Sequence, residues 1–140
     1  MQLSELLTKN PILAKESESY QLDTSDPSQI LAQLKETIKK DFPEAPDANF
    51  TVKYVDEALE DYLSPAFYLT SPIDDYKENS IYINEGSHYE KMKLFTTLAH
   101  EGFPGHLYQN VFANTSGLPS VRQLLNYSGY TEGWATYVEM

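Results

Sequence analysis

The sequence predicts an α+β fold that is predominantly helical, with a small β-sheet packed on helices. Apolar residues follow helical spacing over two stretches, residues 27–40 and residues 88–113. Three short segments, at 50–54, 66–70 and 80–84, are rich in aromatic and β-branched residues and are typical of strands. Helices that flank a small group of strands give the α+β class.

The chain is long enough for one domain. Its 140 residues can bury roughly two-thirds of their unfolded surface, and its hydrophobic share of 41% is ordinary for a soluble globular protein. We expect a single domain over residues 1–140, with an N-terminal helical segment and linker (1–46), a small sheet region (47–86) and C-terminal helices (87–140). Because the sequence stops inside an expected helix, we expect it to be a fragment of a longer chain.

The N-terminal segment contains one well-marked helix. Residues 1–25 hold a short apolar patch and a polar run, which predict a short helix and a loop. Asp26 is then a helix N-cap, with proline at the next position and glutamine three residues after the cap. Helical spacing continues to Lys39 and Lys40, whose charges suit a helix C-terminus. The breaker-rich stretch 42–47 is a linker.

The sheet region follows the linker. Residues 50–54 alternate apolar and polar side chains, while residues 54–63 are acidic and ambiguous, with a turn of helix as one reading. A turn at 71–75 separates the other two strand candidates, 66–70 and 80–84. We expect the segment 80–84 to be an edge strand beside the following helix, placed to hold an extended substrate. The alternative is a strand that only covers the core.

The C-terminal region begins with a capping box at Ser87–Glu90, which predicts a helix starting near His88, itself a surface residue. The buried stripe of that helix is Met92, Phe95, Leu98 and Ala99. After a Pro-Gly break, a second apolar face is formed by Leu107, Val111 and Phe112. A short helix is expected after Pro119, with Val121, Leu124 and Leu125. Residues 127–130 then turn the chain into a last helix with Thr131 as its N-cap.

Two histidines and a glutamate lie together in the stretch His100-Glu101-Gly102-Phe103-Pro104-Gly105-His106. Six residues of ideal helix rotate about 600°, which would point His100 and His106 some 120° apart. Pro104 disrupts a helix and Gly105 tolerates almost any backbone geometry, so a bulge or restart here could bring both imidazoles to one side. They would then suit a divalent metal. The alternative is an ordinary helix end with two surface histidines.

A second acidic stretch, Thr131-Glu132-Gly133-Trp134-Ala135-Thr136-Tyr137-Val138-Glu139, lies near the C-terminus. Glu132 and Glu139 are seven residues apart and fall on nearly the same helix face. A zinc site with two histidines typically takes a third protein ligand and leaves one position for water. The alternative is a solvated acidic helix face.

Taken together, HEGFPGHLYQ and EGWATYVE resemble the paired signatures H-E-x-x-P-G-H-x-x-Q and E-G-W-A-x-Y-x-E of the bacterial domain-of-unknown-function family 885. The resemblance implies a gluzincin-like zinc metallopeptidase fold, with a zincin-like metal site carried on helices. It implies His100, His106 and Glu132 as ligands of Zn²⁺, and Glu101 as the general base. Members of this family are longer, and many carry export or lipoprotein signals, so we expect an extracytoplasmic parent protein.

Further polar residues of the two motifs are candidates for supporting roles. Gln109, Glu139 and Tyr137 could hydrogen-bond to the ligands and orient them, or could be ordinary polar groups on helix surfaces. Tyr127, Tyr130 and Tyr137 could also stabilise an oxyanion, although packing in the core or at its rim is the alternative for each.

Composition excludes several function classes. The net charge of −11 leaves no basic surface for nucleic acid and disfavours adsorption to anionic lipid. No apolar run approaches the ~18 residues of a membrane span, and zero cysteines rule out disulfides and thiolate zinc sites. The partners we expect are a peptide or small protein substrate and the remainder of the parent chain.

The leading interpretation is a zinc-dependent hydrolase, a metallopeptidase that uses metal-activated water. The competing interpretation is a non-catalytic helical scaffold or binding domain, in which Phe103 and Trp134 are core anchors and Pro104-Gly105 is an interhelical turn. Metal-dependent hydrolysis of a bond other than a peptide would use the same ligands.

Overall fold

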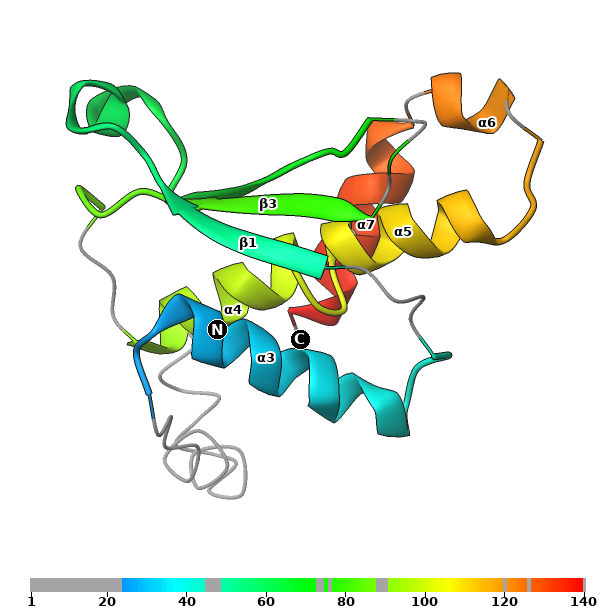
Figure 1. Cartoon of the computed structure of the whole chain (residues 1–140), viewed down its shortest axis with the longest axis horizontal. Coiled ribbons are helices and arrows are strands. Elements are labelled where there is room, and N and C mark those ends of the chain that lie inside the picture. Colours follow the sequence, from blue (N-terminus) through cyan, green and yellow to red (C-terminus); the bar gives the residue numbers. More distant parts are fainter. Residues whose placement is uncertain are drawn as a thin grey trace, which may run out of the picture.

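The computed structural model describes residues 24–44, 49–72, 75, 77–87, 91–119, 121–125 and 127–139. The helix expected near the N-terminus and the surface position expected for His88 lie outside the described residues. The fold is α+β, with helices before and after a three-stranded sheet (Figure 1). In the described ranges, no helix combines the length and the apolar character that crossing a bilayer requires.

The first described helix, α3 (Pro27–Thr37), begins where the capping signal predicts. Asp26 Oδ1 accepts a hydrogen bond from the Ser28 N–H at 2.9 Å, and a 3-10 turn, η1 (Ile38–Lys40), extends the helix. The residues on its inward face that helical spacing predicts are buried: Ile30, Leu31, Leu34 and Ile38. This face packs against the helix α4 (Lys91–Glu101) and the strand β1 (Asn49–Tyr54).

The sheet consists of β1 (Asn49–Tyr54), β2 (Ala66–Leu69) and β3 (Glu78–Ile83) in the order β1-β3-β2. β3 pairs with β1 in parallel and with β2 in antiparallel orientation. The acidic segment between β1 and β2 forms a 3-10 helix, η2 (Glu57–Tyr62).

The prediction of an edge strand at 80–84 is therefore wrong, because β3 is the central strand. β2 is the edge strand that lies against α4. β3 alternates buried and half-buried side chains, with Asn79, Ile81 and Ile83 on the core side. A strand with partners on both sides has its backbone groups occupied, so it cannot hold an added peptide.

In the described part of the chain, four helices follow the sheet: α4 (Lys91–Glu101), α5 (His106–Thr115), α6 (Val121–Leu124) and α7 (Ser128–Val138). Figure 1 shows α3 and α4 along one face of the sheet, with α5 and α7 grouped at one end of the molecule. The centre of the core contains residues that are at most 1% exposed: Ile30, Leu31, Ile81, Leu98, Phe103, Leu107 and Val111.

The C-terminal helices differ in detail from the sequence prediction. Leu94 is a buried residue of α4 that the predicted stripe omits, Phe95 is only half-buried, and the Met92 side chain lies outside the described part. The short α6 forms, but its apolar side chains are exposed, with Leu124 at 73%.

The prediction that Thr131 caps the last helix is wrong. α7 begins three residues earlier, at Ser128, and its N-cap residue is Tyr127. Thr131 lies inside the helix, where its Oγ1 donates to the Ser128 carbonyl oxygen at 3.2 Å. A residue inside the helix cannot serve as its N-cap, because capping requires a residue at the helix boundary with a non-helical backbone.

Candidate metal centre

The histidine motif breaks the helix at the place that the proline and glycine predict. α4 ends at Glu101 and α5 begins at His106, with residues 102–105 forming a tight loop that includes a cis Phe103–Pro104 peptide bond. The Gly105 N–H donates to the Ala99 carbonyl oxygen at 2.9 Å, so the loop folds back onto the end of α4. A Cβ at Gly105 would overlap the carbonyl of His100, far inside contact distance. Only glycine fits this approach.

The loop brings the two imidazoles together. The ring centroids of His100 and His106 lie 4.7 Å apart and the rings are nearly perpendicular, at 87°. α7 packs against both α4 and α5 and adds Glu132. Glu132 Oε2 lies 3.6 Å from His100 Nε2, and Glu132 Oε1 lies 3.6 Å from His106 Nε2. Ligand atoms of these three residues all lie within 4.8 Å of one another, in a group that could hold a metal ion.

The separations can be compared with those between donor atoms around a small divalent cation. Bonds of about 2.0–2.1 Å in tetrahedral geometry place neighbouring donor atoms about 3.4 Å apart. The two 3.6 Å distances are close to that value but run to different oxygens of Glu132, and the ligand atoms of the whole group lie within the wider limit of 4.8 Å. Two imidazoles and one carboxylate are also a donor set that zinc accepts in sites with one open position. The same separations are compatible with ion pairs between protonated histidines and Glu132.

Glu101, the last residue of α4, lies beside this group. Its Oε2 accepts a hydrogen bond from the backbone N–H of Tyr68 in β2 at 2.8 Å. Burial raises the pKa of Glu101 above its ordinary value of 4.5, while the Tyr68 hydrogen bond and the nearby histidines act in the opposite direction. A carboxylate with a raised pKa is better matched to accepting and returning a proton near neutral pH.

Of the two further candidates, Glu139 contacts a histidine of the group, whereas Gln109 makes no side-chain hydrogen bond to it in the described part of the chain. The Glu139 carboxylate contacts His100 Nδ1, so His100 has one carboxylate at each ring nitrogen. Glu132 in α7 and Glu139, the residue that follows α7, therefore both reach His100 from the same side. Gln109 is half-buried in α5, and its amide nitrogen is buried and makes no hydrogen bond within the described part of the chain.

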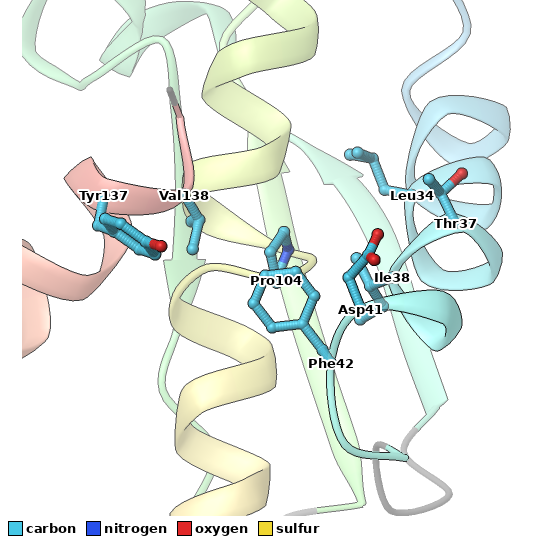
Figure 2. A pocket seen from close by; sticks show the side chains of 8 residues that line it. All are labelled: Leu34, Thr37, Ile38, Asp41, Phe42, Pro104, Tyr137 and Val138. Atoms are coloured by element: carbon cyan, nitrogen blue, oxygen red, sulfur yellow. The ribbon is translucent and has the colours of Figure 1, made fainter.

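The three tyrosines near the C-terminus are exposed. Tyr127, Tyr130 and Tyr137 show 61%, 68% and 63% of their surface, so none of them packs in the core. The Tyr137 ring lies 6.3 Å from that of Trp134 and borders an apolar pocket of about 500 Å³ (Figure 2). This pocket lies between Pro104, the end of α7 and the end of α3, and none of the grouped His and Glu residues lines it.

Trp134 connects α7 to the loop of the histidine motif. Its Nε1 donates to the Pro104 carbonyl oxygen at 2.7 Å, and Phe42 packs edge-on against its ring at 6.1 Å. The indole therefore restrains the sliding of α7 along the loop. Because Glu132 belongs to α7, its position is restrained as well.

Sequence reasoning missed Tyr68. It belongs to a strand that the sequence does locate, but it lies 33 residues before Glu101. The hydrogen bond uses its backbone, which carries no side-chain signal. Only the strand order brings it to the site.

The chain is similar to a family of bacterial proteins and to a solved structure. The family model described as "Bacterial protein of unknown function (DUF885)" matches residues 4–140. A crystal structure described as a "putative lipoprotein" from Colwellia psychrerythraea is similar at 28% identity and a TM-score of 0.70. The similarity covers 82% of this chain and 20% of that one, so the chain spans about a fifth of the length of this neighbour. No curated protein matches.

Proposed function

The chain belongs to the DUF885 family of bacterial proteins of unknown function, and we propose that it carries the metal site of a zinc-dependent hydrolase that cleaves peptide bonds. The observation that carries the proposal is the convergence of His100, His106 and Glu132 from three helices, with the half-buried carboxylate of Glu101 beside them. Helix ends that meet in this way over a proline-glycine loop give a compact site with two imidazoles and one carboxylate.

In this proposal each side chain has a distinct role. Zinc, when bound, supplies Lewis acidity that activates a water molecule and polarises a carbonyl group. Glu101 accepts the proton of that water and returns it to the leaving amine. Its Oε2 is held by the Tyr68 N–H, which leaves Oε1 for the proton.

Glu139 supports the role of His100. A carboxylate at Nδ1 accepts the ring N–H, which places the free lone pair on Nε2, the nitrogen that faces Glu132. Such a partner orients the ring and makes it a better ligand. His106 and Gln109 lie three residues apart on α5, so the amide of Gln109 is a second candidate for an orienting role.

The location and the partners are proposed for the longer protein. The similar structure is described as a "putative lipoprotein", and this supports an extracytoplasmic location for the protein to which this chain belongs. We propose a peptide or small protein as the substrate.

A structural role for the motifs is the second candidate. The hydrogen bond from Trp134 to Pro104 and the full burial of Phe103 favour it, because both residues hold the helices together whether or not a cation binds. In that case Glu132 forms ion pairs with His100 and His106, and removal of divalent cations leaves the stability of the fold unchanged.

The test is zinc content measured by elemental analysis after incubation with zinc and desalting. We expect about one ion per chain in the wild type and in Glu101→Gln, and strong loss in His106→Ala and Glu132→Ala. Glu57→Ala, an exposed glutamate of η2, is the matched control and should keep its zinc. Zinc at 100-fold over its Kd should stabilise the fold by about 2.7 kcal/mol.

The scaffold interpretation gives the opposite result. A wild-type chain that holds no zinc, with a melting temperature that is the same in zinc and in chelator, would reject the metal site. If zinc binds, Glu101→Gln separates catalysis from binding, because this variant should keep the ion and lose peptide hydrolysis.

A further inference from the structure

Tyr68 occupies the middle of β2, the edge strand against α4. Its backbone pairs with Ile81 of β3, and its side chain is half-buried on the inner side of the sheet. The backbone N–H of Tyr68 donates to Glu101 Oε2 at 2.8 Å. The main chain of this residue therefore holds the carboxylate at the end of α4.

The side chain of Tyr68 is the centre of a partly buried polar network. Its hydroxyl donates to Asn79 Oδ1 at 2.6 Å and accepts from Asn110 Nδ2 at 3.0 Å. Asn79 is only 2% exposed, and its Nδ2 donates to the Asn49 carbonyl oxygen at 3.2 Å. Ser71 completes the network, since its Oγ accepts from Asn110 Nδ2 at 3.2 Å. Hydrogen bonds of this kind are strong in a low dielectric and costly to leave unmade.

The network reaches the helix of the second histidine. Asn110 lies four residues after His106 in α5, which places both on nearly the same side of the helix. A hydrogen bond that fixes Asn110 to the sheet therefore limits the rotation and the sliding of α5. The position of the His106 imidazole depends on both movements.

We propose that Tyr68 is a positioning residue that sets the end of α4, with Glu101, and the start of α5, with His106, in a fixed relation. The inference rests on the proposed metal site. The main chain of Tyr68 holds Glu101 and its hydroxyl holds α5 through Asn110, so one residue of the sheet connects the two helices in addition to the loop between them. Within the described ranges, Tyr68 makes no hydrogen bond to a candidate ligand.

The experiment is titration of the wild type and variants with Co²⁺, whose visible spectrum reports ligand geometry. Tyr68→Phe keeps the ring and the backbone N–H and removes only the hydroxyl. Tyr82→Phe is the matched control, because this half-buried tyrosine of the neighbouring strand stacks on Phe67 at 5.2 Å on the outward face of the sheet. Asn110→Leu removes the same hydrogen bond from the side of α5. It tests the connection independently if Tyr68→Phe does not fold.

We expect Tyr68→Phe to bind Co²⁺ with a changed spectrum and about tenfold lower affinity, which is the low end of the range for residues that support metal ligands. Asn110→Leu should give the same change, and the double variant should lose no more than the larger single effect, because both remove one connection. Tyr82→Phe should match the wild type in spectrum and affinity.

Two failures are distinguishable. If Tyr68→Phe and Asn110→Leu melt at lower temperature in chelator but keep the wild-type spectrum and affinity, the network is only part of the core and the inference is wrong. If the wild type itself binds no Co²⁺, the proposed metal site fails, and the inference fails with it. In a protein that hydrolyses peptides, Tyr68→Phe should also lower kcat more than it changes KM.

Discussion

Gly105→Ala is the substitution that tests most directly how the two histidines are brought together. The added Cβ would overlap the carbonyl oxygens of His100 and Ala99. Even a close contact between carbon and oxygen needs about 3.3 Å, so the loop must move away from the end of α4 by more than about 1 Å. The hydrogen bond from the Gly105 N–H to Ala99, now 2.9 Å, would break with it.

The displacement acts on both ligand histidines at once, because the loop lies between them. Metal–ligand distances are tolerated within about 0.2 Å, so a shift of this size should abolish simultaneous binding by His100 and His106. Overpacking costs about 1–3 kcal/mol and the lost hydrogen bond about 1 kcal/mol. A total near 3 kcal/mol corresponds to a fall in Tm of about 10 °C for a chain of this size.

The assay combines zinc content with thermal unfolding in chelator and in zinc. Gly133→Ala is the matched control: it lies inside α7 next to Glu132, and an added Cβ there meets no atom within 4 Å. Replacing a helical glycine by alanine should stabilise the chain by about 0.5–1 kcal/mol and leave zinc content unchanged. A Gly105→Ala chain with one zinc and a Tm within about 2 °C of the wild type would refute the reasoning about the loop.

Other contacts can be tested in the same assays. Asp26→Ala removes the acceptor for the Ser28 N–H and should cost about 1 kcal/mol without loss of zinc. Trp134→Phe keeps a ring but removes the donor to Pro104, so it should lower the free energy of unfolding by about 1 kcal/mol and weaken zinc binding. An unchanged zinc affinity would show that this hydrogen bond does not position Glu132. Burial raises the pKa of Glu101 above 4.5, so in chelator its ionised form destabilises the fold at neutral pH. This cost is absent below about pH 4.5 and grows as pH rises through the folded-state pKa. Glu101→Gln should therefore melt above the wild type at pH 7 and not at pH 4, and equal melting at pH 7 would contradict this account.

The sequence by itself determined the local structure. Asp26 and the proline after it place the start of α3, and the segments around β1, β2 and β3 are visible from their residue types. The Pro-Gly pair in the histidine motif predicts that a helix ends and restarts there, and α4 and α5 do so. These features depend on residues within a few positions of one another, where backbone and side-chain preferences decide the outcome.

The tertiary structure alone decided which strand and which residues lie beside the histidine motif. Strand order is set by long-range pairing, and alternation of side chains cannot tell that β3 is central or that β2 faces α4. For that reason the sequence misplaced the edge strand and gave no sign of Tyr68, whose contacts to Glu101 and Asn110 span 33 and 42 residues. The close approach that requires Gly105 likewise exists only once the loop is folded against α4, because the atoms that exclude a Cβ belong to the preceding helix.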